Sequence, residues 1–168
     1  MLDIPREASS SFDDIVQERE TRVLRAAYRI LGNWADAEDV AQEVFLRLHR
    51  HGVSFPNDAA LGAWLYRVTV NLCLDRNRSV RPSCEMPELP SMDRSAETSA
   101  IREQEKRRLM AALAMLPPRE RVAVVLREIE GLSTGEVATA MGSAEATVRS
   151  QVAKGIARLR GILNREER

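Results

Sequence analysis

The chain has 168 residues, of which 44% are hydrophobic and 30% are charged. This length suits one or two small domains with modest cores, and no apolar run approaches the ~20 residues of a membrane span. The N-terminal sequence lacks the basic and apolar segments of a signal peptide, so we expect a cytoplasmic protein. The two cysteines form neither a zinc motif nor a disulfide framework, and no metal or cofactor is expected.

The charge is balanced overall but unevenly distributed along the chain. Residues 1–80 carry 10 basic and 12 acidic side chains, residues 81–100 carry 2 and 4, and residues 101–168 carry 13 and 9. Affinity for DNA that does not depend on sequence comes mainly from neutralised phosphates. We therefore expect weak binding to DNA by the chain alone, so that either dimerisation or a larger partner has to supply affinity.

Apolar residues at helical spacing predict three helices in the first part of the chain. The first ends at Gly32, the second runs from about residue 35 to 50, and the third from about 61 to 78. A loop at residues 51–60, broken by Pro56, separates the last two. This part is predicted to form a helical domain over residues 12–78.

The second of these helices carries an acidic face, which lies mostly off its buried stripe. The face contains Asp36, Glu38, Asp39, Gln42 and Glu43. Such a face is most often simply solvated. The alternative is a basic protein partner, because these carboxylates would repel phosphates.

The third predicted helix has a polar face beside the loop. Arg67, Asn71, Leu74 and Arg78 follow one another at spacings of four, three and four residues and so share a side of the helix. Asparagine and arginine suit an unstacked base and its phosphates. Phe55 in the loop is either a stacking group or a loop anchor.

The two cysteines and two histidines have plain interpretations. Cys73 falls on an apolar helix and is predicted to be a small core residue, whereas Cys84 lies in a polar segment as an exposed thiol. His49 and His51 are read as a solvated helix end rather than a metal site.

Residues 79–100 contain three prolines and five serines and have the composition of a flexible linker. A second helical domain is predicted over residues 101–163. Its first helix passes through Leu109, Leu113 and Leu116 and is broken at Pro117, and the next helix ends at Gly131.

A helix-turn-helix is predicted at the end of the second domain. Ser133 and Glu136 fit a capping box, and Gly142 suits the positive φ of the turn that follows. The last helix carries basic residues on one side, including Arg149 and Lys154, which favours DNA over the alternative of a plain helical hairpin. Arg149 and Lys154 suit guanine edges or phosphates, and Ser150 and Gln151 suit bases or backbone.

Four segments together resemble the bacterial extracytoplasmic-function (ECF, group 4) sigma factors of RNA polymerase. They are ADAEDVAQEVFLRL (35–48), AWLYRVTVNLCLDRNR (63–78), LPPRERVAVVLREIEGLSTGEVATAMG (116–142) and ATVRSQVAKGIARLR (146–160). The resemblance implies an all-α fold of two small domains, sigma region 2 and sigma region 4, joined by the linker. It also implies an alternative sigma factor that directs core RNA polymerase to promoters. An anti-sigma factor, in many cases linked to a membrane, would hold it inactive.

The resemblance assigns roles to residues on three surfaces. The core-polymerase-binding residues would be Asp36, Asp39, Gln42, Glu43 and Phe45. The residues at the minus-ten element would be Phe55, Arg67, Asn71 and Arg78, with Asn71 at the family position that contacts a flipped base. The residues at the minus-thirty-five element would be Glu145, Thr147, Arg149, Ser150, Gln151, Lys154 and Arg158.

The chain departs from the family pattern around its last helix. Ser143 and Ala144 replace the usual apolar residue and serine, Gln151 replaces a basic residue, and Gly155 stands inside the helix. A glycine there costs on the order of 0.5–1 kcal/mol relative to alanine. Two other functions remain as alternatives, a dimeric regulator of duplex DNA and a decoy that binds only an anti-sigma protein. No nucleophile–base pair, phosphate loop or metal set points to an enzyme or a small-molecule substrate.

Overall fold

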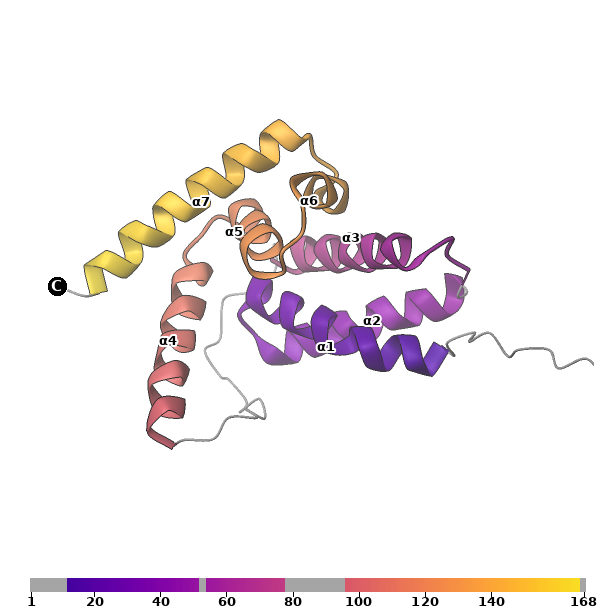
Figure 1. Ribbon diagram of the computed structural model, residues 1–168, viewed down its shortest axis with the longest axis horizontal. Helices are drawn as coiled ribbons and strands as arrows, with labels where there is room; N and C mark the ends of the chain where they lie inside the picture. The colour runs from indigo at the N-terminus through magenta and orange to yellow at the C-terminus, as the bar shows by residue number, and fades with distance from the viewer. Residues whose placement is uncertain (1–11, 52–53, 78–95, 167–168) are drawn as a thin grey trace, which may run out of the picture.

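A computed structural model describes residues 12–51, 54–77 and 96–166 of the chain. These residues form seven α-helices and one short π-helix, without a strand among them, which confirms the predicted all-α fold (Figure 1). The elements in chain order are α1 (Phe12–Leu31), α2 (Trp34–His51), α3 (Asp58–Asn77), α4 (Ala96–Ala114), α5 (Pro118–Val124), the π-helix η1 (Val125–Ile129), α6 (Thr134–Met141) and α7 (Glu145–Glu166).

Two asparagines set the starts of α2 and α3. The side-chain oxygen of Asn33 accepts a hydrogen bond from the amide of Asp36 at 3.0 Å, and that of Asn57 accepts one from the amide of Ala60 at 2.8 Å. Each satisfies an amide that has no partner within its helix. Because of the Asn57 cap, α3 begins at Asp58, so the last three residues of the predicted loop 51–60 are helical.

Helices α1, α2 and α3 pack into a bundle that forms the N-terminal half of the described chain (Figure 1). Cys73 of α3 is fully buried, as predicted. The buried stripe of α2 is the one that its apolar spacing predicts, formed by Ala37, Val40, Ala41, Val44, Phe45 and Leu48. Cys84 lies outside the described residues. Gly32 ends α1 with a φ of +71°, as its position in the sequence predicts.

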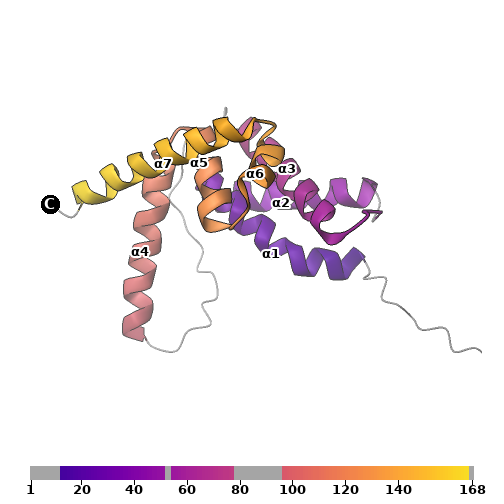
Figure 2. The same ribbon diagram turned by 45° about the horizontal axis from the view of Figure 1, so that its top comes forward.

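The C-terminal half comprises α4 to α7. Helix α4 begins at Ala96, so five residues of the segment predicted as linker are helical, and Leu109 is exposed rather than packed inward. The far end of α4 and the C-terminal end of α7 both extend away from the body in the two views (Figures 1 and 2). The helices are therefore held together mainly where α5 crosses α7 and α6 packs against α7.

Gly155 is required by the packing of α7 against α5. A Cβ atom at this position would lie 2.6 Å from Val124 Cγ2 and 3.4 Å from the backbone oxygen of Glu120. Gly155 departs from the family pattern and lowers helix propensity, but it lies where α5 and α7 approach each other closely. The loss of helix propensity is offset by contact between α5 and α7 that a larger residue would prevent.

The helix predicted to run up to Gly131 changes its geometry before it ends. The amide of Glu130 donates to the carbonyl of Val125 at 2.9 Å, and the amide of Leu132 donates to the carbonyl of Leu126 at 3.0 Å. The first bond belongs to the π-helix η1 and the second closes its C-terminal end, and the apolar spacing of the sequence does not reveal either. π-Turns of this kind are frequent at functional sites.

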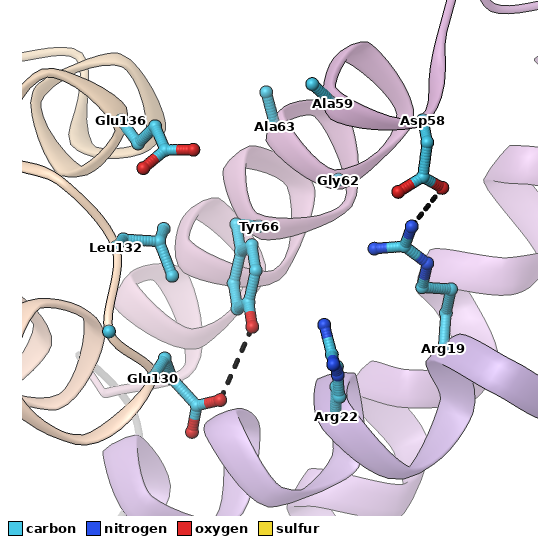
Figure 3. A pocket seen from close by; sticks show the side chains of 11 residues that line it. Arg19, Arg22, Asp58, Ala59, Gly62, Ala63, Tyr66, Glu130, Leu132 and Glu136 are labelled. Atoms are coloured by element: carbon cyan, nitrogen blue, oxygen red, sulfur yellow. Dashed lines mark hydrogen bonds and ion pairs between the residues drawn. The ribbon is translucent and has the colours of Figure 1, made fainter.

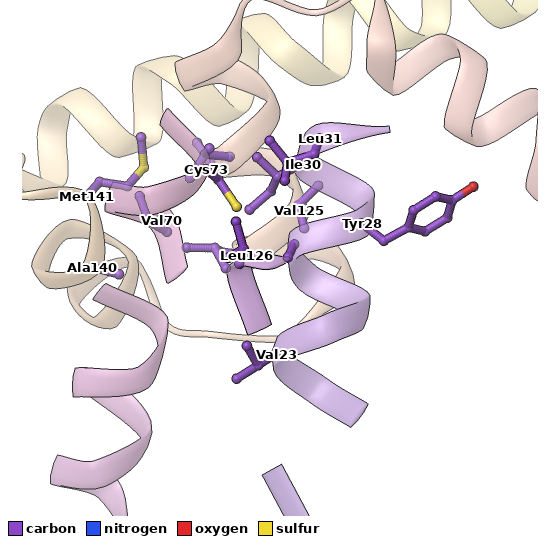
Figure 4. Packing of buried hydrophobic residues seen from close by; sticks show 14 of the residues in the cluster. Val23, Tyr28, Ile30, Leu31, Val70, Cys73, Val125, Leu126, Ala140 and Met141 are labelled. Carbon is purple, nitrogen blue, oxygen red and sulfur yellow. The ribbon is translucent and has the colours of Figure 1, made fainter. Parts of the chain in front are cut away.

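The two halves of the chain, predicted as separate domains, share one hydrophobic core. Helix α1 contacts α4, α5 and η1, and α3 contacts α5 and α6. Val70 and Cys73 from α3 lie in the same cluster as Leu126 and Met141 from the C-terminal half (Figure 4). We call this interface the seam. Helix α3 is consequently covered on two sides, by α1 and α2 and by the C-terminal half.

Candidate functional site

The acidic face of α2 is tied to α3 by one arginine. Nη1 of Arg76 lies 2.9 Å from Oδ1 of Asp36 and 3.3 Å from Oδ2 of Asp39. Asp36 is half-buried, whereas Asp39 is exposed. Sequence analysis did not single out Arg76, because its partners lie 40 and 37 positions away and spacing within one helix cannot show a contact between two.

Phe45, which the resemblance assigns to the polymerase-binding surface, lies on the buried stripe of this helix. Phe45 is only 8% exposed and belongs to the core, so the structure does not bring it to the surface. Its neighbour Leu46 is 51% exposed. Gln42 is exposed, and Glu43 pairs with Arg47 at 2.7 Å. The surface that a partner would meet therefore combines Asp39 and Gln42 with Leu46, and Phe45 packs in the core beneath it.

Helix α3 presents one exposed stripe, formed by Arg67, Asn71 and Asp75 at spacings of four residues. Leu74, predicted on the same face, is half-buried, and Arg78 lies outside the described residues. Among the described residues, no side chain forms a hydrogen bond or ion pair with Arg67 or Asn71. The stripe therefore offers a cation and an amide to a ligand without first having to break a contact.

Phe55 takes part in an aromatic cluster at the end of α2. Its ring centroid lies 5.6 Å from that of His51 and 5.9 Å from that of Trp64, and His51 stacks on Trp64 at 5.6 Å with the rings 12° apart. Phe55 is half-buried. Of the two interpretations left open by the sequence, this packing favours the loop anchor. The cluster also accounts for His51 without a metal.

The helix-turn-helix has the local structure that the sequence predicts. The amide of Glu136 donates to Oγ of Ser133 at 3.2 Å, and the amide of Ser133 donates to Oε2 of Glu136 at 2.7 Å, which completes the capping box. These bonds lower the pKa of the Glu136 carboxyl. Gly142 ends α6 with a φ of +59°, in the left-handed region that residues with a Cβ rarely adopt.

Helix α7 exposes most, but not all, of the residues predicted to contact DNA. Thr147, Arg149, Ser150 and Lys154 are exposed, and Arg149 pairs with Glu145 at 3.4 Å. The side chains of Arg158 and Gln151 differ from these in their contacts.

Arg158 is also exposed, with 58% of its side chain accessible, and its Nε lies 2.9 Å from Oε2 of the largely buried Glu120 on α5. Gln151 is half-buried, and its side-chain oxygen is enclosed without a hydrogen-bond partner among the described residues. The exposed basic side chains predicted on α7 are therefore Arg149, Lys154 and Arg158, of which Arg149 and Arg158 each pair with a carboxylate.

A cavity of about 270 Å³ opens on the seam, between α1, α3 and the residues that follow η1 (Figure 3). Arg19 is paired with Asp58 at one end, and the Tyr66 hydroxyl donates to Oε2 of Glu130 at 3.3 Å at the other. Burial, reinforced by the negative charge of Glu130, raises the pKa of Tyr66 to about 12, so the hydroxyl keeps its proton. The acidic groups here already have partners.

The described part of the chain provides no other reactive centre. Its histidine, cysteine, aspartate and glutamate side chains form no group of three that could hold a metal ion. None of the described helices is long and apolar enough to cross a membrane. The three surfaces that stand out are thus the acidic face of α2, the exposed stripe of α3 and the outer side of α7.

Family models match both halves of the chain. The model described as "Sigma-70 region 2" matches residues 15–82, and "Sigma-70, region 4" matches residues 106–159. The chain is 40% identical to the ECF RNA polymerase sigma factor SigE of Mycolicibacterium smegmatis, over 93% of this chain and 63% of that protein. It is 36% identical to the ECF RNA polymerase sigma factor SigM of Mycobacterium tuberculosis, over 92% of this chain and 79% of that protein.

The chain belongs to the ECF sigma factors of RNA polymerase. This confirms the predicted family, while its group 4 subdivision stays a prediction. The fold agrees with that of the sigma factor RpoE of Bartonella quintana, solved with the anti-sigma factor NepR, at a TM-score of 0.73 and 21% identity. That match covers 91% of this chain and 96% of RpoE. The chain spans 63% of the length of the SigE relative.

Proposed function

We propose that this chain binds core RNA polymerase and directs it to promoters with a minus-ten and a minus-thirty-five element, where it starts DNA opening. It supplies recognition and no catalytic residue of its own, and it acts in the cytoplasm. The observation that supports this proposal is that a member of the ECF sigma family presents three separate exposed surfaces of different chemistry. They are the acidic face of α2, the exposed stripe of α3 and the outer side of α7.

The acidic face of α2 is the proposed polymerase-binding surface. Asp39 and Gln42 provide the polar contacts, and Leu46 provides the apolar anchor that interfaces place near their centre. Arg76 holds Asp36 and Asp39 in fixed orientations before binding. The carboxylates would then lose little conformational entropy when a basic surface of the polymerase binds them.

The exposed stripe of α3 is the proposed minus-ten surface. Asn71 would hydrogen-bond an unstacked base, and Arg67 would neutralise a neighbouring phosphate. Unstacking costs a few kcal/mol, so base pairs open only where the protein recovers that free energy by holding the base. Helix α3 is suited to this because its neighbours cover it on two sides and fix its position.

The outer side of α7 is the proposed minus-thirty-five surface. In a helix-turn-helix the second helix enters the major groove. Arg149 and Lys154 would contact guanine edges or phosphates there, and Thr147 and Ser150 would contact bases or backbone. Arg158 is exposed but pairs with Glu120 on α5, so we expect it to contribute less to this contact than Lys154.

Regulation by an anti-sigma factor is the last part of the proposal. The structural relative from Bartonella quintana is bound to the anti-sigma factor NepR. A protein inhibitor of this kind would cover the acidic face of α2 or the outer side of α7.

Transcription with purified core RNA polymerase tests the function. The template carries the promoter upstream of the gene for this chain, and the variants are Asn71→Ala and Asp39→Arg. Matched controls are Asn164→Ala, at an exposed asparagine near the end of α7, and Glu105→Arg, a charge reversal at an exposed residue of α4. Binding to core polymerase is measured in parallel by co-elution on a sizing column.

We expect the wild type and both controls to start transcription. Asp39→Arg should lose core binding, and Asn71→Ala should keep core binding and lose opening. If the wild type binds no core enzyme and instead shifts duplex DNA alone, the proposed function is wrong and a dimeric regulator replaces it.

A further inference from the structure

The cavity on the seam contains charged side chains that none of the three proposed surfaces uses. It measures about 270 Å³ and is lined by α1, α3, the residues after η1 and α6 (Figure 3). Arg19 pairs with Asp58 at one end, and Oε1 of Glu130 lies 2.5 Å from an arginine of α1. The other two charged side chains of the lining, Arg22 and Glu136, form no ion pair among the described residues.

Arg22 and Glu136 approach the cavity from different helices. In Figure 3 the guanidinium of Arg22 extends from α1 next to Tyr66, and Glu136 extends from α6 on the other side of Leu132. The carboxylate of Glu136 uses only Oε2 to accept from the amide of Ser133, and its pKa is lowered, so it stays ionised with Oε1 available. The cavity thus presents an unpaired cation and an unpaired carboxylate to whatever enters it.

Arg121, a buried cation on the seam, shows what a satisfied arginine looks like in this molecule. Its Nη1 donates to the carbonyl of Ile30 at 2.8 Å, while Nη2 donates to the carbonyls of Ala114 and Leu116 at 2.6 and 3.1 Å. These carbonyls lie at helix ends and have no partner within their helices. A ligand therefore finds its cation in Arg22 and not in Arg121.

Gly62 on α3 is a second observation that points to a ligand. A glycine inside a helix is less favourable than an alanine. A Cβ atom at Gly62 would lie 3.5 Å from Nη1 of Arg19, an ordinary van der Waals distance, whereas one at Gly155 would lie 2.6 Å from Val124. Packing therefore requires the glycine at 155 but not the one at 62. A glycine also allows a ligand to approach the backbone closely, and Gly62 lines the cavity.

The rest of the lining is apolar and small. Ala59, Ala63 and Leu132 contribute to it together with Tyr66, whose hydroxyl already donates to Glu130. Pockets for drug-sized ligands measure about 300–1,000 Å³. A cavity of about 270 Å³ with this lining suits a molecule of the size of one amino acid with an aliphatic side chain.

We propose that this cavity binds a free α-amino acid with an aliphatic side chain. Its carboxylate pairs with the guanidinium of Arg22, whose planar fork matches a carboxylate. Its ammonium pairs with Oε1 of Glu136, and its side chain lies on Gly62 and against Leu132. A plain anion leaves Glu136 unpaired and a plain amine leaves Arg22 unpaired, so a zwitterion is the ligand class that satisfies both.

The inference goes beyond the proposed function, because binding of the amino acid depends on neither polymerase nor DNA. A ligand in the cavity contacts α1, α3 and α6 at once. Helix α3 carries the proposed minus-ten surface, and α6 packs against the helix that carries the proposed minus-thirty-five surface. The cavity is therefore a place where the concentration of a metabolite acts on the chain.

Titration of the ¹⁵N-labelled full-length chain with L-leucine, followed by NMR, tests the site. Gly62 and Gly131 both line the cavity, and their amide signals should shift as the ligand binds. We expect saturable binding with a Kd of about 1 mM or tighter, because two charge-assisted pairs form. The amide shifts report both the affinity and the place of binding.

Two analogues of L-leucine separate the contributions of its charges. 4-Methylpentanoate has the same carbon skeleton without the ammonium group, and 3-methylbutylamine lacks the carboxylate. Each should bind about tenfold or more weakly than L-leucine, because it leaves Glu136 or Arg22 without a partner.

Variants of the lining test the assigned roles. Arg22→Gln and Glu136→Gln should each weaken binding of L-leucine by about tenfold or more, with Arg25→Gln on α1 and Glu128→Gln on η1 as matched controls at exposed positions outside the cavity. Gly62→Ala should also weaken binding, while it raises the melting temperature by about 1–4 °C because alanine favours the helix. A glycine that serves only folding would lower the melting temperature when replaced.

Three results would overturn the proposal. One is that L-leucine shifts neither glycine amide at about 10 mM. Another is that 4-methylpentanoate binds as tightly as L-leucine, which would make the site one for plain anions. The third is that Arg22→Gln and Gly62→Ala bind L-leucine like the wild type, because the ligand would then lie elsewhere. None of these measurements involves polymerase or DNA, so failure of the amino-acid site is distinguishable from failure of the proposed function.

Discussion

Helices α3 and α7 are both proposed to contact DNA, but they are built differently. Helix α7 buries one side against α5 and α6 and exposes a broad outer side. Helix α3 is covered by α1 and α2 on one side and by α5 and α6 on the other, which leaves only the narrow stripe of Arg67, Asn71 and Asp75. A broad side suits a groove of duplex DNA, whereas a narrow and firmly held stripe suits a single unstacked base.

The largest expected effect that tests this difference between α3 and α7 comes from a promoter whose strands are already separated at the minus-ten element. Asn71→Ala should reduce transcription from a duplex promoter by about 10- to 100-fold, the effect of losing a hydrogen bond to a base in an otherwise buried contact. On a template with a preformed bubble at the minus-ten element the defect should largely disappear, because unstacking is no longer required. The measurement is the yield of transcript from the two templates.

Arg149→Ala is the contrasting variant on α7. It should lower transcription from both templates by a similar factor, because a bubble at minus ten does not replace a contact at minus thirty-five. Equal rescue of both variants by the bubble would contradict the division of labour between α3 and α7.

The second prediction concerns how firmly α7 is held. Gly155→Ala places a methyl group 2.6 Å from Val124 Cγ2 and should lower the free energy of unfolding by about 1–3 kcal/mol. Gly161→Ala, six residues later on the same helix, meets nothing within 4 Å and should raise it by about 0.5–1 kcal/mol. Urea unfolding followed by circular dichroism measures both. Stabilisation by Gly155→Ala would show that α5 and α7 do not approach as closely as described.

Local structure could be predicted from the sequence, and contacts between distant segments could not. The capping box of Ser133 and the turn at Gly142 were predicted because their hydrogen bonds and dihedral angles join near neighbours in the chain. The apolar stripe of α2 followed from its period. The fold class followed from apolar residues at helical spacing and from the resemblance to the ECF sigma factors.

Sequence reasoning missed the seam, the bonds of Arg76 and Arg121, and the bond between Glu130 and Tyr66 for a common reason. Each joins residues that lie far apart in sequence, so no spacing reveals them. Helix α3 is apolar on several sides, which signals burial but not what buries it. Phe45 and Leu46 differ from these cases, because the helical spacing places Phe45 on the buried stripe of α2, as observed, and leaves Leu46 off it.

The third prediction separates two basic residues of α7. Lys154→Ala should remove one phosphate contact and so lower the salt dependence of holoenzyme binding to a minus-thirty-five duplex by about 0.9 in slope, or roughly 3.5-fold in affinity between about 50 and 200 mM salt. Arg158→Ala should leave this slope unchanged and instead destabilise the fold by up to about 1 kcal/mol, because it removes an ion pair with Glu120 whose arginine is 58% exposed and screened by solvent. Fluorescence anisotropy at several salt concentrations, with urea unfolding, distinguishes them. A reduced salt dependence of DNA binding for Arg158→Ala would show that Arg158 contacts a phosphate.

The smallest effect concerns α6, which contacts both α3 and α7 and therefore connects the two surfaces. Backbone and side-chain hydrogen bonds from Ser133 lower the pKa of the Glu136 carboxyl below its usual range. A carboxyl whose pKa is lower in the folded state stabilises the fold above its ordinary pKa, near 4.3, and this contribution is lost as the pH falls through the lowered value.

Glu136→Gln keeps an acceptor for the amide of Ser133 but cannot titrate. The difference in unfolding free energy between the wild type and this variant should therefore be constant from neutral pH down to about pH 5 and shrink below it. Because Glu136 is exposed and screened by solvent, the difference should be on the order of 0.5 kcal/mol at most. Urea titrations at stepped pH measure it, with Glu128→Gln as the control on η1. A difference that grows as the pH falls would mean that the charge of Glu136 opposes the start of α6, and the cap would then rest on Ser133 alone.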